Sequence, residues 1–182
     1  MNTLHAKNRS SYDRIAPAFA VRNAFMPPTV LESAHHFITL VPSGGRILDA
    51  GCGAGRDSAW FASQGFQVTA FDLSTGMLRE AGKIVSCSRT QGDMLCLPFL
   101  THSFDALWCN AALLHVPKAQ APACLSGFQR VLKQGGVFYL ALKAGTGELW
   151  EPESYDLAAP RFFARYSLVE GTQLVESAGF QV

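Results

Sequence analysis

The stretch RILDAGCGAGRDSAW, Arg46–Trp60, decides the fold of this 182-residue chain. A short apolar run leads into three glycines within five residues (Gly51, Gly53 and Gly55), and a helical pattern follows them. Glycine is entropically costly to order, so such a cluster indicates a turn that only glycine makes easily. A glycine-rich turn between a strand and a helix typically cradles a nucleotide-like ligand.

Strand-like and helix-like segments alternate along the rest of the chain. Repeated strand–helix units of this length predict an α/β fold: a Rossmann-like, doubly wound, mostly parallel sheet flanked by helices. The expected strands are 46–50, 66–72, 88–93, 104–110 and 136–143. The expected helices are 29–40, 56–65, 74–84, one within 118–136 that ends at Gly135–Gly136, and 167–179. We expect an irregular segment at 144–166 and the start of a further strand at 180–182.

Composition indicates one globular domain spanning 1–182, with a helical cap over 1–45. The formal net charge is +1 and the charges are dispersed, which disfavours nucleic acid or an anionic membrane as partner. Five cysteines without a C-x-x-C spacing favour reduced thiols in the cytoplasm over a disulfide framework or a zinc site, and no metal ligand set stands out. The polar N-terminus lacks the apolar core of a secretory signal, and no apolar run approaches the ~18 residues that span a bilayer.

The spacing of the glycine loop discriminates between ligands. The loop reads G-x-G-x-G, whereas the dinucleotide fingerprint G-x-G-x-x-G would need glycine where this chain has Arg56. Asp49, two residues before Gly51, would repel a pyrophosphate but attract a ligand that carries an ammonium and a sulfonium. S-adenosylmethionine is such a ligand, and it contains no phosphate.

Two further carboxylates follow the next two expected strands. Asp72 is placed to accept hydrogen bonds from ribose hydroxyls. Asp93 is placed to accept one from the adenine amine, while the N–H of Met94 serves a ring nitrogen. A single aspartate in such a place is as often a helix cap or a turn residue, but three in register with a glycine loop are hard to assign to capping. Asp49, Asp72 and Asp93 would thus contact the amino-acid, ribose and base parts of one ligand.

Five segments carry a family resemblance: ILDAGCGAGRDS, VTAFDLSTGML, QGDMLCLPF, SFDALWCNAALLHVP and LKQGGVFYLAL. In order and spacing they resemble the motifs of class I S-adenosylmethionine-dependent methyltransferases, over about 46–143. The likeness is greatest to the small-molecule branch with ubiquinone/menaquinone-type and tellurite-resistance-type enzymes. It implies an enzyme that methylates a small molecule by in-line transfer and releases S-adenosylhomocysteine.

The resemblance also implies roles for individual residues. Leu73 and Met77 would sandwich the adenine ring, although plain core packing explains them nearly as well. We expect Cys52 to be a small buried side chain under a tight turn rather than a nucleophile. Asn110 and Ala111 would line the sulfonium and amino end of the cofactor. The full set of expected cofactor-binding residues is Asp49, Gly51, Cys52, Gly53, Gly55, Asp72, Leu73, Met77, Asp93, Met94, Asn110 and Ala111.

Two residues are candidates for a catalytic role. His115 is the best-placed general base, needed only if the acceptor has a proton to lose, and it could instead orient its loop. Tyr12 lies in a segment, SYDRIAPAFA, that resembles the one folding over the cofactor in relatives. His5 and His102 belong to no recognisable constellation. Relatives place an acceptor-binding insert at 144–166, where an aromatic and arginine-rich surface suits a planar or anionic acceptor: Trp150, Tyr155, Arg161, Phe162, Phe163, Arg165 and Tyr166.

Two departures from the family pattern keep alternatives open. The family sheet ends in an antiparallel hairpin that is incomplete here, since the chain ends at Val182. Either the product is truncated or another chain, such as a second copy, completes the open edge. Asn110-Ala111-Ala112-Leu113 also differs from the Asn/Asp-Pro-Pro-aromatic pattern of nucleobase amine methylases, which disfavours methylation of a DNA or RNA base. The alternatives are a non-catalytic protein that binds S-adenosylmethionine or assists assembly and, less favoured, an NAD(P)-dependent oxidoreductase.

Overall fold

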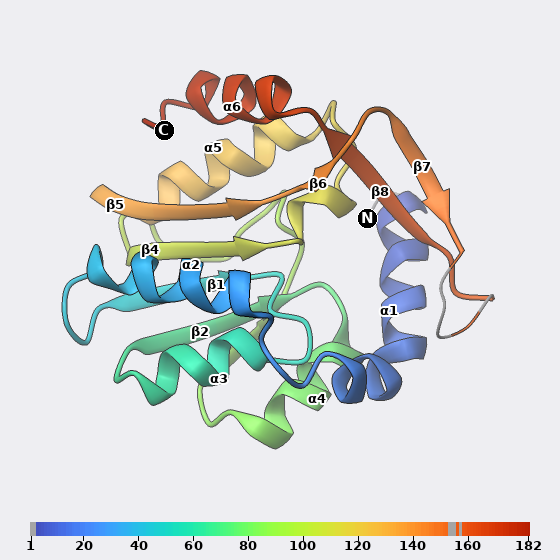
Figure 1. Cartoon of the computed structure of the whole chain (residues 1–182), viewed down its shortest axis with the longest axis horizontal. Helices are drawn as coiled ribbons and strands as arrows, with labels where there is room; N and C mark the ends of the chain where they lie inside the picture. The colour runs from blue at the N-terminus through green and yellow to red at the C-terminus, as the bar shows by residue number, and fades with distance from the viewer. Residues whose placement is uncertain (1–2, 153–155, 157) are drawn as a thin grey trace.

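Five parallel strands form the central sheet, in the order β3-β2-β1-β4-β5. The structure, a computed structural model, describes residues 3–152, 156 and 158–182 (Figure 1). The strands are β1 (Arg46–Ala50), β2 (Gln67–Asp72), β3 (Ser88–Gln91), β4 (Phe104–Asn110) and β5 (Leu132–Ala141). This sheet, with helices on both faces, confirms the predicted Rossmann-like α/β fold.

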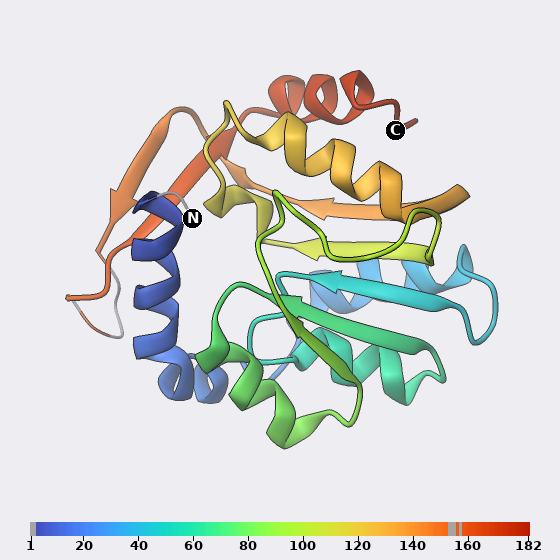
Figure 2. The same cartoon turned by 180° about the vertical axis from the view of Figure 1, so that it is seen from behind.

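Helices cover both faces of the sheet, as Figures 1 and 2 show from opposite sides. Successive side chains of a strand point to opposite faces. Ile47 therefore packs in the cluster formed with α2 and α3, and Leu48 in the cluster formed with α5 and α6. The helices are α1 (Thr3–Arg22), α2 (Pro28–Thr39), α3 (Arg56–Ser63), α4 (Thr75–Ile84), α5 (Ala121–Val131) and α6 (Leu168–Ser177), with a 3-10 turn at Leu113–His115. None of the helices in the described residues is long and apolar enough to cross a membrane.

The strand order fixes where a ligand can enter. From β1 the chain moves outward through β2 to β3 and then returns to β4 on the other side of β1. In open parallel sheets the crevice at such a reversal lies beyond the carboxyl ends of the strands. Helix α1 lies across these ends, packed on α4 (Figure 1). Local sequence accounts for the start of α4, since Ser74 caps it by accepting a hydrogen bond from the N–H of Met77.

The sequence analysis expected an irregular segment at 144–166, but most of the described residues of this segment form strands. It supplies most of a second, three-stranded sheet in the order β6-β8-β7, in which β8 is parallel to β6 and antiparallel to β7. Polar and apolar residues do not alternate cleanly along this segment. β8 (RFFARY) is buried along most of its length, so it lacks the alternating polarity by which a half-buried strand is recognised. The strands are β6 (Lys143–Ala144), β7 (Glu148–Glu151) and β8 (Arg161–Tyr166).

Two other expected boundaries are wrong. The helix within 118–136 does not continue to Gly135–Gly136, because α5 ends at Val131 and β5 starts at Leu132. Gly135 adopts φ 72° inside an irregular stretch of β5, where the pairing with β4 shifts register. The glycine pair therefore lies in a β-bulge and does not end a helix. Residues 180–182 form no strand after α6.

Candidate functional site

A cavity of about 360 Å³ lies at the carboxyl ends of the strands, between the glycine loop and α1. Its wall includes both candidate catalytic residues, Tyr12 and His115. Every residue expected to bind the cofactor lines it except Gly55: Asp49, Gly51, Cys52, Gly53, Asp72, Leu73, Met77, Asp93, Met94, Asn110 and Ala111. The fold thus brings together residues that are dispersed over a hundred positions of the sequence.

The loop glycines differ in what they do. Gly51 has φ 82°, and a Cβ there would lie 2.2 Å from the Cβ of Ala112, so only glycine fits. Gly53 has φ 54° and donates its N–H to Asp72 Oδ2 at 2.8 Å. Gly55 lies outside the cavity, where its φ of 87° starts α3 and a Cβ would lie 2.7 Å from the Cβ of Ala81. Gly55 therefore packs between α3 and α4, and its expected contact with the ligand stays a prediction.

Asp49 is a buried carboxyl at the end of β1, with 2% of its surface exposed. Ser58 Oγ donates a hydrogen bond to Asp49 Oδ2 at 2.5 Å. Burial, reinforced by the negative charge of Asp57, raises the pKa of Asp49 to about 8. A carboxyl whose negative form is this unfavourable gains most from a cationic ligand in the cavity.

Asp72 is held at the end of β2 by the backbone. Its two carboxylate oxygens accept hydrogen bonds from the N–H groups of Gly53 and Ser74, both at 2.8 Å. Burial raises its pKa to about 6, although these hydrogen bonds oppose the shift. Asp72 therefore joins the glycine loop to the start of α4 and presents a fixed acceptor to the cavity.

Asp93 has a partner that the sequence analysis missed. His5, from α1, contacts Asp93 Oδ2 through Nδ1 at 2.8 Å, and the N–H of Leu95 donates to Oδ1 at 3.0 Å. His5 is buried and lines the cavity, so the view that it belongs to no constellation is wrong. The two residues lie 88 positions apart, and no local pattern in the sequence signals their contact.

Asp57 is a second cavity residue that the sequence analysis missed. Its Oδ2 accepts hydrogen bonds from Trp108 Nε1 and Asn110 Nδ2, both at 2.9 Å, and its Oδ1 accepts one from Arg56 Nε at 2.7 Å. These contacts fix the amide of Asn110 at the end of β4. The next residue, Ala111, has φ 53°, a left-handed conformation that is uncommon for a residue with a Cβ.

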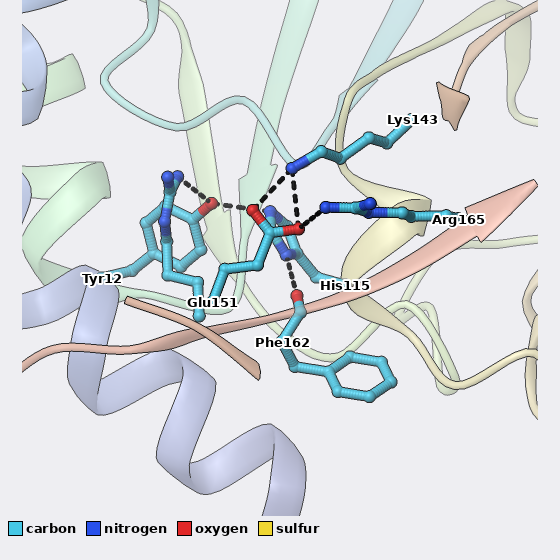
Figure 3. A network of polar contacts seen from close by, with 7 residues as sticks. Tyr12, His115, Lys143, Glu151, Phe162 and Arg165 are labelled. Carbon is cyan, nitrogen blue, oxygen red and sulfur yellow. Dashed lines mark hydrogen bonds and ion pairs between the residues drawn. The ribbon is translucent and has the colours of Figure 1, made fainter. Parts of the chain in front are cut away.

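Tyr12 and His115, 103 positions apart in sequence, meet at the cavity wall (Figure 3). The Phe162 carbonyl can only accept, so His115 Nδ1 carries a proton and donates to it at 2.7 Å. His115 Nε2 then accepts from the Tyr12 hydroxyl at 2.6 Å. Arg161 Nη1 donates to the same hydroxyl oxygen at 3.1 Å.

The surroundings of His115 keep it uncharged at neutral pH. Burial lowers its pKa to about 4, and the positive charges of Arg161 and Lys143 act in the same direction. Both ring nitrogens are engaged in hydrogen bonds. The histidine expected as a general base is therefore held as a neutral acceptor for the Tyr12 hydroxyl.

Residues of the small sheet surround this pair. Glu151 accepts hydrogen bonds from Lys143 Nζ at 2.7 Å and 2.9 Å and from Arg165 Nη2 at 2.7 Å (Figure 3). Arg161 lies over the rings of Tyr12 and Phe163, with its guanidinium carbon 5.5 Å and 5.1 Å from the two centroids. Tyr155, also named in the sequence analysis, lies outside the described residues.

The chain is similar to known methyltransferases. A family model described as a methyltransferase domain matches residues 47–136. A malonyl-[acyl-carrier protein] O-methyltransferase of Enterobacter lignolyticus is 29% identical over 167 residues, 87% of this chain and 64% of that protein. A demethylmenaquinone methyltransferase of a Parafrankia species is 29% identical over 166 residues, 78% of this chain and 63% of that protein. The chain thus spans less than two thirds of the length of both curated relatives.

The fold also matches solved structures. A 1,6-didemethyltoxoflavin-N1-methyltransferase of Burkholderia thailandensis, solved with bound 1,6-didemethyltoxoflavin and S-adenosylhomocysteine, superposes with a TM-score of 0.75. The match covers 97% of this chain and 77% of that chain at 20% identity, which establishes a shared fold.

Proposed function

We propose that this chain, which belongs to the class I S-adenosylmethionine-dependent methyltransferases, transfers a methyl group from S-adenosylmethionine to a small-molecule acceptor. One observation carries the proposal. Three carboxylates at the ends of three successive strands, Asp49, Asp72 and Asp93, line one cavity together with the glycine loop.

The chemistry of the cavity fits this cofactor and disfavours a phosphate-bearing one. A pyrophosphate would be repelled by ionised carboxylates in the cavity, and it would offer the buried Asp49 no cation to favour its charged form. Arg56, at the third glycine position of the dinucleotide fingerprint, is paired with Asp57. Asp49 gains from a neighbouring ammonium, since burial makes its charge unfavourable. A Cβ at Gly51 would fill the space that the loop leaves beside Met94 and Ala112.

We assign the cavity residues as follows. Asp49, Gly51, Cys52 and Gly53 face the methionine part, with Asn110 and Ala111 at its sulfonium and amino end. Asp72 accepts from the ribose hydroxyls. Asp93 and Met94 hold the adenine, whose ring packs between Leu73 and Met77. All of these residues line the cavity.

The catalytic task of the protein is then mainly positioning. The bound cofactor supplies an already activated methyl group on a sulfonium sulfur. Holding the acceptor in line and excluding water can supply roughly 7–11 kcal/mol of the barrier. Helix α1 closes one side of the cavity. Its His5 contacts Asp93, and its Tyr12 contacts His115.

The direct test is ligand binding to the whole chain, measured by thermal denaturation and calorimetry. S-adenosylhomocysteine at 100 times its dissociation constant stabilises by about 2.7 kcal/mol. For a chain of this size this amounts to a rise of about 5–10 °C in melting temperature, and NAD should give none. Absence of a shift with S-adenosylhomocysteine would overturn the proposal.

A pair of variants ties binding to the site. Asp72→Ala should weaken S-adenosylhomocysteine binding at least about tenfold, since a hydrogen-bonded charged group is lost. Asp105→Ala is the matched control, because Asp105 lies near the start of β4 and binds Lys133, outside the cavity. Transfer is then followed with methyl-labelled cofactor and a low-molecular-weight cell extract. Label in small molecules supports the enzyme, and binding without transfer would favour a non-catalytic protein.

We also propose a cytoplasmic location and a second copy of the chain as partner. All five cysteines are free in the structure, which suits a reducing compartment. Among the described residues β5 is an edge strand of the central sheet, which suits pairing with another chain. The formal net charge of +1 supports a small molecule over a nucleic acid as substrate.

A further inference from the structure

His5, near the start of α1, is a polar residue buried in the cavity wall. Only 3% of its surface is exposed, and both His5 and Asp93 line the cavity. One ring nitrogen, Nδ1, contacts Asp93 Oδ2 at 2.8 Å. The other, Nε2, is buried and has no hydrogen-bond partner among the described residues. Leaving a buried polar atom unpaired costs free energy, so a ligand that supplies the missing partner gains affinity.

The protonation of the pair decides what this partner is. An ionised carboxylate can only accept hydrogen bonds. Asp93 accepts one through Oδ2 from His5 and one through Oδ1 from the N–H of Leu95. His5 Nδ1 therefore carries the proton, and in the neutral imidazole Nε2 is an acceptor. The missing partner is a hydrogen-bond donor.

The cofactor proposed above offers three kinds of donor. Its ammonium group is assigned to Asp49 and its ribose hydroxyls are assigned to Asp72, at the ends of β1 and β2. Its third donor, the exocyclic amine of adenine, is assigned to Asp93, the residue that His5 contacts. This amine carries two protons, and the assignment to Asp93 uses one of them. The second proton is thus a donor placed beside His5.

We propose that His5 Nε2 accepts a hydrogen bond from the exocyclic amine of adenine, so that His5 and Asp93 together bind both amine protons. This inference rests on the proposed function and adds a residue of α1 to the adenine site. Two acceptors select an amine, because a purine with a carbonyl in that position would turn a third acceptor toward them. A donor on the methyl acceptor would lie instead at the sulfonium end of the cofactor, which is assigned to Asn110 and Ala111.

The test compares two ligands by calorimetry with the whole chain. One is S-adenosylhomocysteine, and the other is S-inosylhomocysteine, in which a carbonyl replaces the exocyclic amine. The parent protein should bind S-inosylhomocysteine at least about a hundredfold more weakly, because the buried acceptors are then left unpaired. Equal affinity of the parent for the two ligands would overturn the inference.

His5→Asn isolates the contribution of Nε2. The asparagine amide can still donate to Asp93 from the place of Nδ1, but no atom takes the place of Nε2. S-adenosylhomocysteine should then bind at least about tenfold more weakly, while S-inosylhomocysteine loses little, so the ratio of the two affinities falls. His102→Asn is the matched control, because His102 Nδ1 also contacts a protein oxygen, the Leu132 carbonyl, but His102 is not part of the cavity wall. It should change neither affinity.

The ratio of affinities separates ligand binding from a purely structural role. If His5 only fixes α1 in place, His5→Asn weakens the binding of both ligands to the same extent, and the ratio stays that of the parent. An unchanged ratio, or loss of both ligands together, would therefore overturn the inference.

The two proposals fail separately. If the parent binds S-adenosylhomocysteine and His5→Asn keeps the parent's ratio, the inference about His5 falls and the methyltransferase proposal stands. If the parent does not bind S-adenosylhomocysteine, both fall.

Discussion

At the scale of single residues, burial at the cavity shifts the pKa values of Asp49 and His115. Burial makes the charged form unfavourable in both, so Asp49 tends to hold its proton and His115 tends not to take one. Asp49 is then ready to gain a cationic neighbour. His115 is ready to accept a hydrogen bond. Both shifts also leave a signature in the pH dependence of stability.

Asp49→Asn should stabilise the ligand-free protein above neutral pH. The pKa of Asp49 rises from 3.8 to about 8 on folding, so the unfolded chain loses this proton first as pH rises. The stabilising contribution is present below pH about 4 and is lost as pH rises toward 8. At pH 8 the asparagine variant should exceed the parent by more than about 1 kcal/mol in urea unfolding, with no gain at pH 4. It should also lose S-adenosylhomocysteine binding, and a variant that binds normally would contradict the role given to Asp49.

His115 should remain neutral down to about pH 4 in the folded protein. Its pKa falls from 6.5 to about 4, so its contribution to stability is present above pH about 6.5 and is lost as pH falls toward 4. NMR of the imidazole should show no titration between neutral pH and pH 5. The urea-unfolded chain, as control, should titrate near the ordinary value of about 6.5. Titration of the folded protein near that value would restore His115 as a candidate base.

At the scale of elements, α1 holds the site together. The N–H of Phe162 donates to Asn8 Oδ1 at 3.1 Å, and Ser11 Oγ donates to the carbonyl of Pro160 at 2.6 Å, which joins α1 to β8. Asp13 accepts hydrogen bonds from Ser74 Oγ at 2.6 Å and from the N–H of Gly76 at 2.8 Å, which joins α1 to the start of α4. Negative charge at a helix N-terminus is favourable. α1 therefore spans both sides of the cavity.

Asp13→Ala should loosen α1 from α4. Losing these hydrogen bonds at the N-terminus of α4 should lower the free energy of unfolding by about 1–2 kcal/mol. Arg14→Ala is the matched control from the same helix, because Arg14 pairs with Asp156 at the exposed surface and should change stability little. Chemical denaturation measures both, and hydrogen exchange of α1 amides should be faster in Asp13→Ala only. Equal effects of the two variants would argue against α1 being fixed through Asp13.

The sequence predicted those parts of the site that depend on local order. The glycines and the aspartates at strand ends follow from strand–turn–helix units, so their place beyond the sheet could be inferred. The contacts of α1 could not, since Tyr12 is 103 residues from His115 and 149 from Arg161. The helix end predicted at Gly135–Gly136 was wrong for another reason. Glycine marks a helix end and a bulge equally well, and pairing with β4 decides between them.

At the scale of the whole molecule, the two edges of the central sheet differ. β3 is a four-residue edge strand with the polar sequence SRTQ, which discourages pairing. β5 is a ten-residue edge strand, and a hollow of about 1560 Å³ lies along it and α6. Apolar side chains line this hollow, among them Phe138, Leu140 and Phe180. None of the residues expected to bind cofactor lies in it, so the larger hollow is separate from the candidate site.

We expect the whole chain to self-associate through this open edge. A second strand laid along β5 would satisfy its outer backbone groups and cover the apolar hollow, so association should increase with protein concentration. Sedimentation across a wide concentration range measures it. Leu140→Lys places a charge in the hollow and should shift the equilibrium toward monomer. Leu100→Lys, at a position 82% exposed and outside the hollow, should not. A chain that stays monomeric throughout, or equal behaviour of the two variants, would show that β5 does not pair with a second copy.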